Sequence, residues 1–147
     1  MELGSIQKAW IKSLRENPER QTTGKLGFVN FDGQHKRCCL GELHCIYREQ
    51  NGKEPVIDEN LDLLDVPVGI NEPGQYSSKF DQSLEATFED LGLRDSLGLM
   101  QESFFIDNGD YVQPFNNLAD LNDGGFTWEQ IADMVENDPE NFFTKSL

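Results

Sequence analysis

Cys38-Cys39-Leu40-Gly41-Glu42-Leu43-His44-Cys45-Ile46-Tyr47 is the stretch around which the fold is predicted to form, and it holds all three cysteines of the chain. At 100° per residue one helical face collects Cys39, Leu43, Ile46 and Tyr47, with Leu40 beside them. The other faces collect Glu42, Arg48 and Glu49. Asn51-Gly52 then offers a left-handed stop. The pattern predicts a central helix with one buried stripe.

Two more helices are predicted at the ends of the chain. Apolar residues recur at helical spacing from Leu3 to Leu14, which predicts a helix from Ser5 to Glu16 that ends at Asn17-Pro18. The last helix has Thr127 as its N-cap and Gln130 completing a capping box. Its expected buried stripe is Trp128, Ile131, Ala132 and Val135. Because three amphipathic helices need a common core, we expect Trp10 and Trp128 to pack against the central stripe.

Short strands are predicted between these helices. Lys25–Phe31 and Gln34–Arg37 flank Asp32-Gly33, a strong hairpin signal. A second hairpin is predicted around Asn108-Gly109, with Phe104, Phe105, Ile106, Tyr111 and Val112 in its strands. Leu64–Ile70 alternates like an edge strand with Pro67 in it, and a helix is predicted from about Gln82 to Leu91. We therefore predict one compact α+β domain over residues 1–147, with about four helices and small antiparallel sheets or hairpins.

Composition limits the class of protein. A chain of 147 residues with 37% hydrophobic content can build one core. No apolar run approaches the roughly 18–20 residues that span a bilayer, and the N-terminus lacks the pattern of a signal peptide. An odd cysteine count, with two cysteines adjacent, argues against a disulfide framework. We expect a cytoplasmic protein without a membrane association.

Charge is distributed unevenly along the chain, whose net charge is −15. Residues 1–55 carry nine Lys/Arg and seven Asp/Glu, a net +2, whereas residues 56–147 carry three and twenty, a net −17. Such a surface repels phosphate backbones, so direct nucleic-acid binding is not expected. The acidity serves either solubility or docking on a basic protein surface. The candidate docking residues are Asp58, Glu59, Asp62, Asp65, Glu85, Glu89, Asp90 and Asp95.

The central stretch and its flank also contain residues that could bind a metal ion. Five possible ligands, His35, Cys38, Cys39, His44 and Cys45, lie within eleven residues. Zinc sites usually combine two separated pairs, and Cys38 and Cys45 would stand about 10 Å apart on a helix. Half a site from His35 with Cys38 or Cys39 stays open, but we predict no metal and no cofactor.

A cysteine nucleophile is the enzymatic alternative. Cys38 or Cys39 at a helix N-terminus beside Lys36 and Arg37 would have a lowered pKa. Both histidines, however, lie within seven residues on the same local unit, which is unlike a base delivered from a separate element. Core packing is the commoner role of a free cysteine.

The segment Asp120-Leu121-Asn122-Asp123-Gly124-Gly125 opens like the calcium-binding loop of an EF-hand. Gly125 falls at position six, as an EF-hand requires, but position twelve is Ile131 where a bidentate Glu is needed. We predict a turn leading into the Thr127 cap instead.

Two motifs resemble a family of small uncharacterised bacterial and phage proteins. Cys38–Tyr47 is similar to that family's Cys-Cys-Leu-Gly-Val-Leu-Cys motif, here with His44 inserted before the third cysteine. Leu118–Asp133 is similar to its second motif, Leu-Asn-Asp-Gly leading into a final helix. The motifs cover about a third of the chain and keep the family's order. The family has no established activity, so the resemblance implies only a context, that of a cytosolic accessory protein of phages and mobile elements.

These observations favour a non-enzymatic, acidic interaction protein that binds a host or phage protein with a basic surface. The alternative is a cysteine- or metal-dependent enzyme centred on Cys38 and Cys39. Exposure of the three thiols in the folded protein distinguishes the two hypotheses, because a nucleophile must be reachable.

Overall fold

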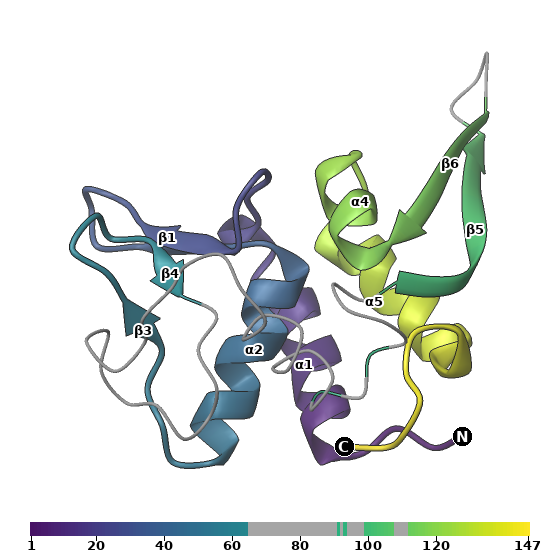
Figure 1. Cartoon of the computed structure of the whole chain (residues 1–147), viewed down its shortest axis with the longest axis horizontal. Coiled ribbons are helices and arrows are strands. Elements are labelled where there is room, and N and C mark those ends of the chain that lie inside the picture. The colour runs from purple at the N-terminus through teal and green to yellow at the C-terminus, as the bar shows by residue number, and fades with distance from the viewer. Residues whose placement is uncertain (65–90, 92, 94–98, 108–111) are drawn as a thin grey trace.

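The computed structural model describes residues 1–64, 91, 93, 99–107 and 112–147, and it has the predicted α+β fold (Figure 1). Its helices are α1 (Ser5–Glu16), α2 (Cys39–Gln50), α4 (Leu118–Asp123) and α5 (Trp128–Asn137), with short 3-10 turns η1 (Pro18–Arg20) and η4 (Pro139–Asn141). Its strands are β1 (Gly27–Val29), β2 (His35–Arg37), β3 (Val56–Ile57), β4 (Leu63–Leu64), β5 (Leu99–Asp107) and β6 (Val112–Asn117). They form three separate antiparallel pairs, β1–β2, β3–β4 and β5–β6.

The three predicted helices share one core. Helix α1 packs against both α2 and α5, with α2 on one side of it and α5 on the other (Figure 1). Trp10, Leu43 and Trp128 are fully buried in this core, and Tyr47 is partly buried against it. The predicted α5 stripe is completely buried, and the Thr127–Gln130 capping box forms. The expected packing of the central stripe with both tryptophans is confirmed.

Helix α2 is buried far beyond the predicted stripe. Glu42 is 1% exposed and Arg48 is wholly buried, whereas the pattern placed both off the apolar face. Both carry charges with local partners: Glu42 accepts from arginines, and the Arg48 Nε donates to the Glu54 carbonyl at 2.8 Å. The single-stripe interpretation was wrong because other segments cover the remaining faces of α2. Gly41 allows one such approach, since a Cβ there would lie 2.0 Å from the Leu26 carbonyl oxygen.

The first predicted hairpin is present but short. Strands β1 and β2 pair Gly27 with Arg37 and Val29 with His35. The β3–β4 hairpin beside it was not predicted. The second predicted hairpin forms as β5 and β6, which pair Asp107 with Val112. The Asn108-Gly109 turn, most of the predicted Leu64–Ile70 strand and the predicted Gln82–Leu91 helix lie outside the described residues.

The segment before Thr127 was predicted as a turn; residues up to Asp123 form the short helix α4, and the turn that leads to Thr127 is confined to Gly124-Gly125. Its buried Asn122 joins the two motifs of the sequence. The Asn122 Oδ1 accepts from the Cys39 backbone N, the Gln21 Nε2 and the Trp128 Nε1, each at 3.1 Å. The Asn122 Nδ2 donates to the Thr22 carbonyl at 2.7 Å. This side chain therefore ties α2, α4 and α5 together. Within the described residues, no helix combines the length and apolar character needed to cross a membrane.

Candidate functional site

The turn between β1 and β2 presents an aromatic side chain to solvent. The Asn30 Oδ1 accepts from the backbone N of Asp32 at 3.0 Å and of Gln34 at 2.9 Å, and Gly33 has a φ of 79°. These contacts shape the turn locally, so its form does not depend on the residue at position 31. Phe31 lies at the tip with a relative exposure of 106%. Hydrophobic burial contributes nothing to holding this ring where it is.

The turn between β3 and β4 has the same construction. The Asp58 Oδ1 accepts from the backbone N of Asn60 and of Asp62, both at 2.9 Å. Leu61 has a φ of 66° and is the only non-glycine residue with positive φ in the described part of the chain. This conformation costs a leucine on the order of 1 kcal/mol, and its side chain is still 46% exposed. A strained and exposed leucine is costly to the fold and is typical of a functional position.

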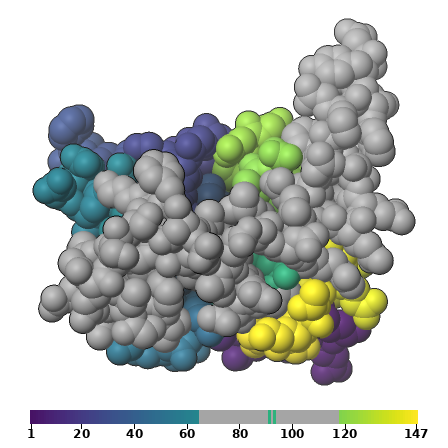
Figure 2. Space-filling model, viewed as in Figure 1, coloured from purple at the N-terminus to yellow at the C-terminus, as the bar shows by residue number. Residues whose placement is uncertain are grey.

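The two turns lie side by side. The backbone N of Val29 donates to the Leu61 carbonyl at 2.9 Å, and Phe28 bridges to Asp62. Both turns project together from one end of the molecule, at the left of Figure 1 and of Figure 2. We call Phe31, Asp32, Asp58, Glu59 and Leu61 the hairpin-tip surface. It combines two exposed apolar side chains with three carboxylates.

The carboxylates make this surface strongly acidic. Asp32 and Glu59 are exposed and form no ion pair with any described residue. The neighbouring Asp62 pairs with the Lys25 Nζ at 3.0 Å, and this ammonium group also lies over the Phe28 ring at 5.2 Å. Lys25 is thus occupied by Asp62 and Phe28. Asp32 and Glu59 therefore keep their negative charge beside the exposed apolar groups of the two turns.

The predicted docking residues are brought together in part. Asp58, Glu59 and Asp62 share the β3–β4 turn, whereas Asp65, Glu85, Glu89, Asp90 and Asp95 lie outside the described residues. Other exposed carboxylates belong to the C-terminal helices at the opposite end of Figure 1: Asp120, Asp123, Glu129, Asp133, Glu136, Asp138 and Glu140. These two groups lie at opposite ends of the molecule, and further exposed glutamates lie elsewhere on the surface: Glu2, Glu16, Glu19, Glu49 and Glu54.

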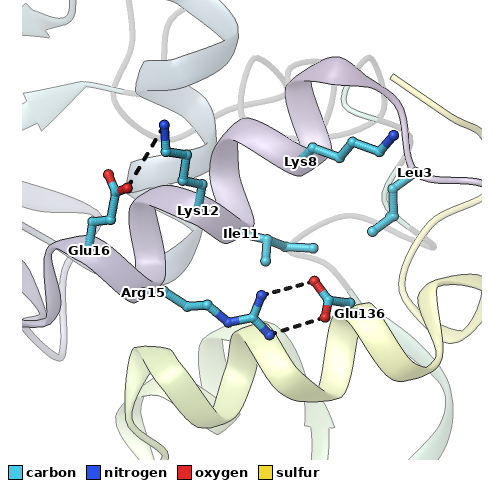
Figure 3. Close-up of a pocket in the computed structure, with 7 residues that line it drawn as sticks. All are labelled: Leu3, Lys8, Ile11, Lys12, Arg15, Glu16 and Glu136. Carbon is cyan, nitrogen blue, oxygen red and sulfur yellow. Dashed lines mark hydrogen bonds and ion pairs between the residues drawn. The ribbon is translucent and has the colours of Figure 1, made fainter.

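The acidic region on α5 is partly neutralised by α1. A hollow of about 350 Å³ lies between α1 and α5. In Figure 3, Arg15 extends from α1 to Glu136, and Ile11 lies between the helices. The Arg15 Nη1 lies 2.9 Å from Glu136, and its Nη2 lies 2.8 Å from Asp133. Lys12 turns toward Glu16 at 3.9 Å. Because charges of both signs line this hollow, it has less net attraction for a charged partner than the hairpin-tip surface.

The cysteine environment contradicts the lowered pKa expected for a nucleophile. All three thiols are buried. Burial raises the pKa of Cys38 to about 11 and of Cys45 to about 12, and it raises the pKa of Cys39 as well. The Cys38 Sγ instead caps α2, accepting from the Gly41 N at 3.4 Å. Desolvation outweighs the favourable helix terminus, so the thiols stay protonated at neutral pH.

The two histidines lie apart in the fold. His35 is exposed on β2, whereas His44 is buried in α2, and its ring nitrogens make no hydrogen bond of normal geometry with the described residues, although the Leu64 backbone lies close. Burial and the charge of Arg48 lower the pKa of His44 to about 4, and the backbone of Leu64 opposes this shift only in part. Among the residues that the structure describes, no three His, Cys, Asp or Glu side chains gather as metal ligands.

Sequence reasoning missed three of the five members of the site: Phe31, Asp32 and Leu61. A two-residue turn at Asp32-Gly33 leaves Phe31 as the last paired residue of the predicted strand Lys25–Phe31. In the structure the pairing ends at Val29 with His35, so the exposure of Phe31 had no signal in the sequence. The positive φ of Leu61 had no signal, because leucine is rarely found in this conformation.

Comparison of the chain with protein-family models, with curated protein sequences and with solved structures gave no match.

Proposed function

We propose that this chain is a non-enzymatic interaction protein whose hairpin-tip surface docks on a basic protein surface. The observation that carries the proposal is the fully exposed Phe31 beside the strained Leu61, with acidic side chains around them. Aromatic residues enriched at the centre of interfaces supply most of the binding energy there. A partner of matching chemistry has an apolar pocket for the Phe31 ring, bordered by lysine or arginine.

The charge of the chain supports the same partner class. A net charge of −15 attracts a basic protein over distance, and the carboxylates at the tips select its orientation. The acidic helix α5 lies away from the tips and is bridged to Arg15, so we assign it to solubility. We therefore assign docking to the hairpin-tip surface alone and not to the whole acidic region, residues 56–147.

The thiols favour this role over the enzymatic alternative. A nucleophile needs an accessible thiolate, but Cys38, Cys39 and Cys45 are buried and their pKa values are raised. The resemblance of the two motifs to phage and bacterial proteins supports a role as an accessory protein of a phage or mobile element. In that setting the partner is a host or phage protein in the cytoplasm.

A capture experiment tests the proposal. The immobilised chain is incubated with a bacterial lysate at about 50 mM salt and eluted with rising salt, because the Debye length falls to about 3 Å at 1 M. We expect a basic protein that elutes with salt and is lost with Phe31→Ala. The double variant Asp32→Asn with Glu59→Gln should weaken capture.

The matched control is Glu129→Gln with Asp138→Asn, which removes the same charge from the other end of the molecule. This control should retain the partner, and all variants should melt within a few degrees of the wild type. An acidic partner, capture that ignores salt, or equal loss in the control would refute the proposed site.

A further inference from the structure

The two turns of the hairpin-tip surface share one five-residue construction, in residues 30–34 and in residues 58–62. In each turn the backbone N of the first residue donates to the carbonyl of the fifth at 2.9 Å, and the backbone N of the fourth donates to the carbonyl of the first at 3.0 Å. The side chain of the first residue, Asn30 or Asp58, accepts from the backbone N of the third and fifth residues. The same four hydrogen bonds therefore recur at equivalent positions.

The fourth residue of this construction has a left-handed backbone in both turns. Its φ is 79° at Gly33 and 66° at Leu61. A three-residue hairpin loop that ends in this conformation normally has glycine there, because glycine carries no steric penalty at positive φ. The first turn follows the rule and the second departs from it. Position 61 thus holds an exposed leucine where the equivalent turn of the same chain holds glycine, and the turn itself does not require that side chain.

The two apolar residues belong to the adjoining sides of the two turns. The backbone N of Val29 donates to the Leu61 carbonyl at 2.9 Å, and Phe31 follows Val29 by two residues. Glu59 and Gly33 come from the strands β3 and β2, which lie on the outer sides of this pair of hairpins. The backbone therefore brings the positions of Phe31 and Leu61 next to each other.

Packing does not hold the first of these residues in place. Phe31 has a relative exposure of 106%, so its position depends on the hydrogen bonds within its turn. A loop that is not ordered in the free protein must be ordered when a partner binds, and this entropy cost reduces the affinity. A turn whose backbone is already fixed by its own side chain avoids that cost.

We propose that Asn30 and Asp58 are positioning residues, which preorganise Phe31 and Leu61 for docking. The inference rests on the proposed function and divides the hairpin-tip surface by role. The Asp58 Oδ1 is used by two backbone N–H groups, so Asp58, a predicted docking residue, acts within its turn. A partner that recognises a preformed surface binds it with little rearrangement of the backbone.

The first test needs no partner. Asn30→Ala removes the acceptor of two turn N–H groups without changing the charge of the chain. We expect ¹⁵N relaxation to show increased backbone motion at residues 31–33. Asn30→Asp should restore the order of the wild type, because a carboxylate serves as the acceptor at the equivalent position of the other turn.

The second test measures docking. The probe is the basic protein that the wild-type chain captures from lysate, purified and titrated into each variant. Asn30→Ala should raise its Kd at least about fivefold, because the loop must now be ordered on binding. When Phe31 is already alanine, the same change should alter Kd by less than about twofold, since Asn30 acts through the ring.

Asn137→Ala is the matched control, at an exposed position at the end of α5, and it should change neither the order of the turn nor Kd. Unchanged motion in Asn30→Ala, unchanged Kd, or an equal loss with and without the Phe31 ring would each overturn the inference and leave the proposed function standing. If the wild-type chain captures no basic protein, the proposed function fails, and the positioning role in docking fails with it.

Discussion

Helix α2 and the hairpin-tip surface differ in which side chains they bury and which they expose. The helix buries charged and polar residues, Glu42, His44 and Arg48 among them, whereas the tips expose Phe31 and Leu61. Burial of a charge is costly unless it is paired, and exposure of a large apolar group forfeits its hydrophobic stabilisation. In α2 most of the polar groups have partners, so their cost is offset within the fold. At the tips nothing in the described structure offsets the cost, which is why we assign binding there.

The largest stability loss is expected from Asn122→Leu. This change leaves the Trp128 Nε1 and the Cys39 N without their acceptor in the core. Each buried donor left unsatisfied costs about 1–3 kcal/mol, so we expect the free energy of unfolding to fall by roughly 2–6 kcal/mol. Chemical denaturation measures it. Asn137→Leu, at an exposed position, is the control and should change stability by less than about 0.5 kcal/mol.

Leu43→Ala tests whether α2 is central to the core. Leu43 is fully buried, and removal of its side chain should lower the free energy of unfolding by about 2–5 kcal/mol. Leu43→Met conserves most of the volume and should cost less than about 1.5 kcal/mol. If the alanine variant unfolds at the denaturant concentration of the wild type, α2 does not organise the core.

His44 should make stability depend on pH. Its pKa is about 4 when folded and 6.5 in its ordinary state, so the unfolded chain binds more protons between these values. Stability is therefore full above pH 6.5 and falls by about 3 kcal/mol as pH drops toward 4. His44→Leu should remove this part of the acid sensitivity in denaturation curves at pH 7 and pH 4.5. Parallel pH dependence in the two proteins would mean that His44 finds a partner for its charged form.

The helices were largely predictable because their signals are local. Helix α1 has the predicted bounds, and the Thr127–Gln130 box opens α5 as expected. Burial of Glu42 was not predictable, because its partners Ser13, Arg20 and Arg37 come from three other elements. Periodicity reports one apolar face and does not report which segments cover the others.

Of the candidate site, Asp58 and Glu59 were predicted, whereas Phe31, Asp32 and Leu61 were missed. Asp58, Glu59 and Asp62 stand out as a charge cluster in the sequence, and the structure brings them together in one turn. These carboxylates lie near Phe31 because the β3–β4 hairpin contacts the β1–β2 hairpin. Strands β3 and β4 have only two residues each. Strands this short carry too little alternation to be recognised.

Leu61→Gly is expected to change stability less than the substitutions in the core, and to raise it. Glycine adopts positive φ without steric cost but has more conformational freedom in the unfolded chain, so we expect the free energy of unfolding to rise by no more than about 1 kcal/mol. The same change removes an apolar side chain from the hairpin-tip surface and should weaken partner capture. Thermal unfolding and capture are compared on one preparation. A destabilised variant would show that the Leu61 side chain supports the fold.

Phe31 is the residue whose contacts test the central claim most directly. Its replacement by alanine should change the free energy of unfolding by less than about 0.5 kcal/mol, because the ring is fully exposed. A photoreactive phenylalanine analogue is therefore placed at position 31 and, as a control, at exposed position 129 on α5, and each protein is irradiated in lysate at low salt. We predict that the analogue at position 31 crosslinks to one dominant basic protein. The analogue at position 129 should not crosslink to that protein. Docking through the hairpin tips would be contradicted if the partner crosslinked only to position 129. It would also be contradicted if position 31 gave no adduct above background.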